Sequence, residues 1–183
     1  MAAESTSSAS QKPKLFSVGA LAWVLISSIA LAILALIVGA PLAQSSGPAA
    51  FAFSIYKAFS FVCHQIPERS FHLAGHQFAV CSRCMGLYSG FAVAALVYPL
   101  ARSLKRTDTP STIWLMLAAA PLAIDFALGY FSIWANTHLS RFLTGALLGA
   151  VAVFFVMPGL IAVSSAIAYY FGPKSANQTL PTS

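Results

Sequence analysis

The sequence predicts an all-α, polytopic membrane helix bundle with four transmembrane helices and one short interfacial or re-entrant helix. Three observations carry this prediction: hydrophobic residues make up 58% of the 183 residues, charged residues make up 8%, and the mean hydropathy is +0.80. Soluble domains contain roughly 45–50% apolar and about 25% charged residues. So few charges cannot cover a water-soluble globule of this size. A soluble enzyme, a disordered chain and a nucleic-acid-binding module are therefore excluded.

Four apolar stretches are long enough to cross a bilayer, because about 20 residues at ~1.5 Å each cover roughly 30 Å of hydrocarbon. We place the spans at about 18–40, 78–100, 113–134 and 142–165. A cleaved signal peptide is the alternative for the first stretch, but the apolar core of such a peptide is usually only about 7–15 residues long. The break between Pro41 and Pro48 predicts a turn after this span.

Two further apolar segments depart from the length of a simple span. Residues 49–62 are aromatic and apolar but short, and Lys57 interrupts them, which favours an interfacial or re-entrant helix over a fifth span. The last apolar run continues from Phe142 to Phe171, and we expect Pro158-Gly159 to kink or end its helix.

The spans form a single transmembrane domain, residues 18–171, between two polar tails. Residues 1–17 predict a disordered cytoplasmic tail, and residues 172–183 predict a flexible one. Short loops rich in Lys and Arg stay in the cytoplasm. The short loop after the second span carries Arg102, Lys105 and Arg106. We therefore expect a multi-pass protein of the cell membrane with both termini cytoplasmic, the lipid bilayer as its surroundings, and the segment that follows residue 62 facing outward.

The densest chemistry lies in that outward segment. All three cysteines of the chain, Cys63, Cys81 and Cys84, fall within 22 residues. The two-residue gap between Cys81 and Cys84 lets both thiolates reach one metal ion, and Cys63 adds a third thiolate. We expect His64 as the fourth ligand, with His76 as the alternate. Thiolate and imidazole ligands suit zinc or copper(I), so the sequence indicates a Cys/His metal site.

Other interpretations of the cysteines stay open. They could be small apolar fillers at a helix end, or Cys63 could form a disulfide with Cys81 or Cys84. A membrane thiol–disulfide oxidoreductase would use Cys81 or Cys84 as the nucleophile and Cys63 as the resolving thiol. A third alternative is a non-enzymatic scaffold or lipid-binding protein. The sequence contains no kinase, hydrolase or nucleotide-binding motif, so whether the protein is an enzyme stays open.

Asp125 is an ionisable residue inside the third predicted span, and such a residue costs a few kcal/mol unless it finds a partner. It lies nine residues before Trp134, or about 13 Å along a helix, so we place it in the outer half of the membrane. Arg83 and Arg141 enter from the same side. We expect a charge cluster of these three residues, acting as a structural ion pair or as a functional acid. The two arginines could also bind an anionic headgroup.

Two pairs of glycines have the spacing that allows helices to approach closely. Gly86 and Gly90 lie in the second predicted span, and Gly145 and Gly149 lie in the fourth. Small residues four apart are typical of tight helix contacts in membranes. We expect these two spans to pack against each other just below the cysteines.

The order of these polar residues resembles the signature of the domain of unknown function 2085, a family of small prokaryotic membrane proteins. The matching patterns are CHQ-x-P-x-RSF at residues 63–71, G-x-Q at 75–77, C-x-RC-x-G-x-Y-x-G at 81–90, P-x3-D at 121–125 and N-x4-R-x2-TG at 136–145. The resemblance implies a multi-span protein in which the Cys, Asp and Arg residues belong to one site, and it implies no particular activity. Phe126 and Tyr130 depart from the glycine and glutamine expected at these positions.

Overall fold

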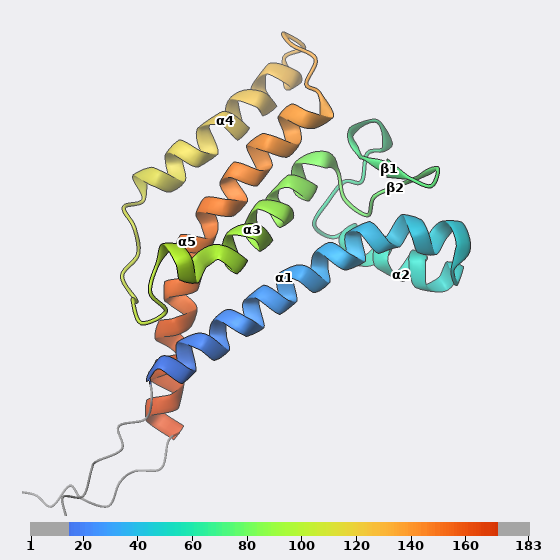
Figure 1. The fold of residues 1–183 in the computed structure, drawn as a ribbon. Coiled ribbons are helices and arrows are strands. Elements are labelled where there is room, and N and C mark those ends of the chain that lie inside the picture. The colour runs from blue at the N-terminus through green and yellow to red at the C-terminus, as the bar shows by residue number, and fades with distance from the viewer. Residues whose placement is uncertain (1–14, 172–183) are drawn as a thin grey trace, which may run out of the picture.

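The computed structural model describes residues 15–171, and almost all of them are helical (Figure 1). The elements are α1 (Leu15–Ser46), α2 (Ala49–Phe59), a 3-10 turn (Pro67–Arg69), β1 (His72–Leu73), β2 (His76–Gln77), α3 (Ser82–Ala101), α4 (Ile113–Tyr130) and α5 (His138–Phe171). Four helices, α1, α3, α4 and α5, are long and apolar enough to cross a membrane, and α2 is short and apolar. The predicted all-α class with four spans and one short helix is confirmed.

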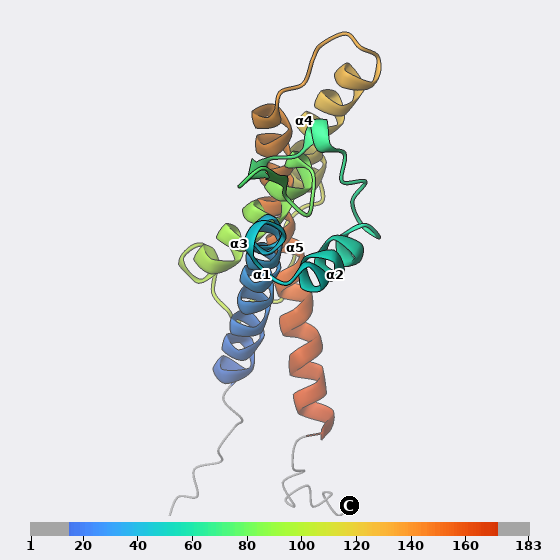
Figure 2. The same ribbon diagram turned by 90° about the vertical axis from the view of Figure 1, so that its right-hand side faces the viewer.

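Helix α1 continues through Pro41 and ends at Ser46, where the sequence had predicted a turn. Proline removes one backbone hydrogen-bond donor from a helix. The neighbouring hydrogen bonds persist in a membrane, because lipid offers the peptide groups no other hydrogen-bond partners. The chain reverses after Gly47, and α2 folds back against the last turns of α1 (Figure 2). Eleven residues make α2 about 16 Å long, too short to cross a bilayer.

Helices α3 and α5 form the centre of the bundle, and their glycines explain how closely they pack. A Cβ atom added to Gly86 would clash with the Phe142 carbonyl oxygen, and one added to Gly149 would clash with that of Leu87. Gly90 and Gly145 face the partner helix in the same way. Hydrogen at these positions therefore lets the two backbones touch.

A second layer of contacts joins α1 to this central pair. The buried Tyr98 of α3 packs among Val153 and Met157 of α5 and Ala22 of α1. The Trp23 indole donates a hydrogen bond to the Ala95 carbonyl oxygen, with an N···O distance of 2.7 Å. Helix α4 packs mainly on α5 (Figure 1). Many large apolar side chains on these helices point outward, as expected for surfaces in contact with lipid.

Helix α5 runs without interruption from His138 to Phe171, although Pro158 lies within it. It changes direction along its length, as Figure 1 shows. At about 51 Å it exceeds the hydrocarbon thickness, so it must tilt, bend or protrude. The start of α1, the loop between α3 and α4, and the end of α5 lie at one end of the molecule (Figure 1). The segment from Cys63 to Cys81 lies toward the other end.

Candidate functional site

The fold brings the three cysteines together at the beginning of α3. Cys63 follows α2, Cys81 is the residue before the first turn of α3, and Cys84 lies in that turn. Their three Sγ atoms all lie within 4.8 Å of one another, and those of Cys81 and Cys84 are 3.5 Å apart. All three are free thiols; Cys63 is buried and the other two are half-buried. The cluster is close enough to bind one metal ion.

Gln65 fixes the position of Cys63 relative to Cys81. Its backbone adopts a left-handed conformation, with φ of 51°, which turns the side chain back across the loop. The side-chain amide donates to the carbonyl oxygens of Tyr56 and Ala79, at 2.7 and 2.8 Å. The Gln77 side-chain amide in turn donates to the Gln65 carbonyl oxygen at 3.2 Å. These bonds tie the end of α2 to the segment that leads into α3.

The polar surroundings of the sulfurs favour negative charge. The Cys81 backbone N–H donates to the Cys63 sulfur, with an N···S distance of 3.2 Å. Hydrogen bonds from the Cys63 and Cys84 thiols hold the pKa of Cys81 well below its ordinary value, although burial opposes this shift. The positive end of α3 acts in the same direction. Apolar side chains, including Ile37 and Val80, pack around the cluster and limit the access of water.

The histidines do not join the three sulfurs in the part of the chain that the structure describes. His64 is exposed, and His76 lies in β2, where it lines a separate cavity with Tyr56 and Gln77. His72 and His76 stand on the two paired strands of the loop. His64 as a fourth ligand, with His76 as its alternate, stays a prediction.

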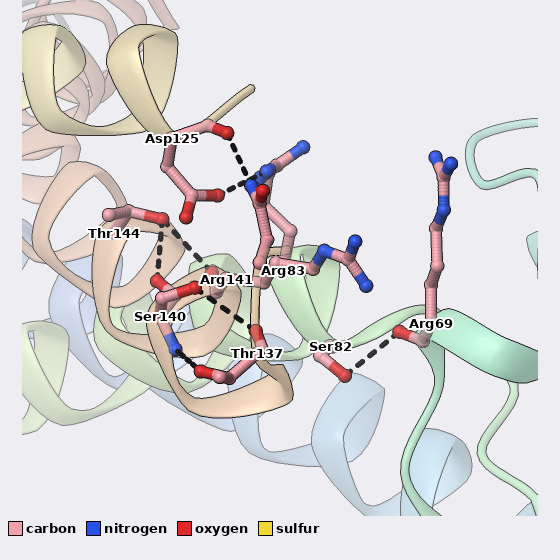
Figure 3. Close-up of polar contacts among 9 residues, drawn as sticks. Arg69, Ser82, Arg83, Asp125, Thr137, Ser140, Arg141 and Thr144 are labelled. Atoms are coloured by element: carbon pink, nitrogen blue, oxygen red, sulfur yellow. Dashed lines mark hydrogen bonds and ion pairs between the residues drawn. The ribbon is translucent and has the colours of Figure 1, made fainter. Parts of the chain in front are cut away.

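The expected charge cluster includes Arg83, which stands between Cys81 and Cys84 in the sequence, and Figure 3 shows its side chains. Arg83 of α3 forms an ion pair with Asp125 of α4, and both side chains are largely buried. The Arg83 guanidinium also lies 5.6 Å from the ring centroid of Phe126. The side-chain amide of Asn136 donates to the Asp125 carbonyl oxygen. Arg141 of α5 is close enough to Arg83 and Asp125 to interact with both electrostatically.

Ser82 connects the cysteine segment to α5, and sequence reasoning missed it. Its buried hydroxyl donates to the Arg69 carbonyl oxygen at 2.8 Å and lies 2.9 Å from Nδ1 of His138. With its single proton donated to the Arg69 carbonyl oxygen, the Ser82 hydroxyl accepts the Nδ1–H of His138. Ser82 thus links the 3-10 turn to the first residue of α5. A buried serine next to a cysteine of the motif carries no distinctive sequence signal. The only sequence signal for the roles of Gln65 and Arg69 is that both belong to the CHQ-x-P-x-RSF pattern.

The fold and this site define a multi-span helical membrane protein with a cysteine cluster at one end of its bundle. The family described as "Predicted membrane protein (DUF2085)" matches residues 63–155, just over half of the chain. The chain belongs to this family. The matched region contains all three cysteines, the ion pair and the four packing glycines.

Two archaeal proteins are similar to this chain. One, an uncharacterised protein of Methanocaldococcus jannaschii, is 36% identical over 104 residues, which cover 57% of this chain and 67% of the relative. The other, an uncharacterised protein of Methanothermobacter thermautotrophicus, is 36% identical over 87 residues, covering 48% of this chain and 77% of the relative. No solved structure matches the chain.

Proposed function

We propose that Cys63, Cys81 and Cys84 bind a thiophilic metal ion, zinc or copper(I), as thiolates. The observation that carries this proposal is the mutual approach of the three sulfur atoms, all within 4.8 Å. In a tetrahedral zinc site with Zn–S bonds of about 2.3 Å, sulfur atoms lie about 3.8 Å apart. The sulfurs therefore need only small movements to close around an ion.

The donor set also matches the preferences of these metals. Soft thiolates select zinc or copper(I) over magnesium or calcium. The backbone N–H that Cys81 donates to the Cys63 sulfur stabilises a thiolate, and Arg83, which lies between two of the ligands in sequence, offsets part of the negative charge. Three protein ligands leave a fourth position for His64, for water or for a passing ligand. A slowly exchanging ion would be a structural link, and a rapidly exchanging ion would be cargo.

We infer that the cysteine end of the bundle faces the outside of the cell. The support is the basic loop between α3 and α4, which contains Arg102, Lys105 and Arg106 at the opposite end and favours the cytoplasm. Labelling intact cells with a membrane-impermeant maleimide tests this orientation. Labelling of metal-depleted wild type, but not of a variant with all three cysteines changed to Ser, supports it. Labelling that requires cell lysis overturns it.

Metal analysis of detergent-purified protein tests the main proposal. We expect about one zinc or copper ion per chain in the wild type and loss of the ion in each single Cys→Ser variant. A His64→Ala variant distinguishes the fourth ligand: weaker binding supports His64, and unchanged binding excludes it. Wild-type protein that stays metal-free after incubation with zinc and with copper(I) overturns the metal site.

The short distance between Cys81 and Cys84 favours a second candidate function, thiol–disulfide exchange. A Cys81 thiolate would attack a client disulfide and release one client thiolate, and Cys84 or Cys63 would then displace the second. The client disulfide gains two electrons and two protons, and the site becomes a disulfide. Metal-free protein whose thiols exchange with a model disulfide supports this candidate over the metal site. In a non-enzymatic scaffold, by contrast, all three Cys→Ser variants would remain active in the cell.

A further inference from the structure

Three arginines from separate parts of the chain lie beside the α3–α5 contact, where Arg141 is within electrostatic range of the charges of the other two. Arg83 is in the first turn of α3, Arg141 is in the first turn of α5, and Arg69 ends the 3-10 turn whose carbonyl group accepts the Ser82 hydrogen bond. Figure 3 shows Arg83 and Arg141 near Asp125, with the exposed Arg69 side chain standing apart from them beyond Ser82. Arg141 is close enough to both other guanidinium groups to interact with them electrostatically. The topology therefore brings Arg69 and Arg83 within electrostatic range of Arg141.

These cations exceed the negative charge available to them. Asp125 pairs with Arg83, and within residues 15–171 neither Arg69 nor Arg141 forms an ion pair. The Arg83 Nε atom is buried without a hydrogen-bond partner in the same part of the chain. Gathering like charges costs free energy unless an anion joins them. The cluster thus has the electrostatics and the free donors of an anion site.

The depth of the arginine cluster in the membrane indicates which anion is available to it. Arg83 and Arg141 stand in the opening turns of the candidate spans Ser82–Ala101 and His138–Ala168. The ends of membrane spans lie at the depth of the lipid headgroups, and the phosphate groups of phospholipids lie at that depth in either leaflet. A guanidinium fork matches a phosphate group with two parallel hydrogen bonds.

A cavity adjoins the arginine cluster through Asp125. It has a volume of about 440 Å³ and opens at the surface between α4 and the start of α5. Its other lining residues are mostly apolar: Pro121, Ile124, Leu128, Trp134 and Ser140. A lipid bound through its phosphate would lay an acyl chain on such a surface, whereas a free anion would leave it uncovered.

We propose that Arg69, Arg83 and Arg141 bind the phosphate group of an anionic phospholipid, with an acyl chain in the cavity beside Asp125. The site shares no ligand with the cysteine cluster, so it stands whether or not a metal binds there. Arg69 and Arg141 supply the free guanidinium groups. Asp125 holds Arg83 in position through their ion pair.

Lipid binding to delipidated protein in detergent tests the proposal, with native mass spectrometry as the measurement. We expect phosphatidylglycerol to bind in preference to phosphatidylcholine. Arg69→Gln and Arg141→Gln should each lower the affinity for phosphatidylglycerol about tenfold, because a hydrogen bond to a charged group contributes roughly that factor. Arg106→Gln removes the same charge at the opposite end of the bundle and should leave the affinity unchanged.

Other outcomes overturn the assignment. Equal binding of the two lipids, or equal losses in Arg106→Gln and Arg141→Gln, would show a general attraction to membranes rather than a site. Displacement of phosphatidylglycerol by millimolar inorganic phosphate would assign the arginines to a soluble anion. An unchanged melting temperature in lipid-free detergent verifies that each variant is folded, and Arg69→Lys, which keeps the charge but loses the fork, should recover only part of the affinity.

Discussion

The ion pair between Arg83 and Asp125 should contribute far more to stability than the pair between Arg102 and Asp108. The side chain of Asp125 is 11% exposed and that of Arg83 is 21% exposed, whereas that of Asp108 is 68% exposed. Removing one partner of a buried pair leaves an uncompensated charge, at a cost of about 3–5 kcal/mol. A pair with one well-exposed partner contributes less, about 0–1 kcal/mol, and only Arg102 is buried in the second pair, at 12% exposure. The two pairs therefore form a matched comparison within one chain.

We expect Asp125→Asn to lower the free energy of unfolding by about 2–3 kcal/mol. This value lies below the full range for buried pairs because Arg83 keeps some exposure and the Phe126 ring, 5.6 Å away, offers a cation–π contact. Asp108→Asn should cost only about 1 kcal/mol, because water reaches the Asp108 carboxylate and the Arg102 guanidinium keeps its hydrogen bond to the Asp108 carbonyl oxygen. Both changes preserve side-chain shape, so the difference between them reports the burial of the charge.

Reversible unfolding in mixed micelles, followed by circular dichroism, measures both values. A double variant, Arg83→Gln with Asp125→Asn, removes both charges and should recover part of the loss, giving a coupling energy above about 1 kcal/mol. The reasoning is refuted if Asp125→Asn costs no more than Asp108→Asn. It is also refuted if the losses of the two single variants simply add in the double variant, because the charges would then not be paired.

Three further predictions concern packing, the loop clamp and the thiols. Gly86→Ala should destabilise the protein by about 1–3 kcal/mol, because the added Cβ would meet the backbone of α5. Gly39 has open space around it, so Gly39→Ala should be neutral or slightly stabilising. Thermal unfolding measures both effects. Gln65→Ala should weaken zinc or copper binding in competition titrations because Cys63 loses its anchor, and Gln44→Ala, an exposed control, should not. In metal-free protein the lowered pKa keeps the Cys81 thiol ionised below neutral pH. The rate of Cys81 alkylation should therefore stay nearly constant from pH 8 to 6. A rate that falls tenfold for each pH unit would contradict this.

The number of spans could be predicted from the sequence, because each span is recognised from the apolar length and low charge of its own residues. The ends of the helices were less predictable. Pro41 was expected to begin a turn, yet α1 continues past it to Ser46. Pro158 was expected to kink or end its helix, and α5 continues past it while changing direction along its length (Figure 1). Lipid offers no hydrogen bonds to a broken helix, so a single missing donor costs less than unwinding. Proline is therefore a weaker stop signal in these helices than in water-soluble ones.

The site was predictable in its residue types and less so in its contacts. A charge inside an apolar span needs a partner, and its depth placed Asp125 near Arg83, where the ion pair forms. The left-handed backbone of Gln65 and the link from Ser82 to Arg69 follow no periodicity. They arise from the way an irregular loop closes over the end of α3, and pattern alone does not encode such closure.

The first turn of α3 joins the two proposed sites, and this has an energetic consequence. Cys81 and Arg83 are two residues apart, and Arg141 interacts electrostatically with the Cys81 sulfur. Without a metal, the cluster carries about one negative charge, on the Cys81 sulfur that accepts hydrogen bonds from the Cys63 and Cys84 thiols. Three thiolates around a divalent ion also carry one net negative charge, because two protons leave as the ion binds. The charge that faces the arginines is therefore the same with and without the ion, so metal and anionic lipid should bind independently.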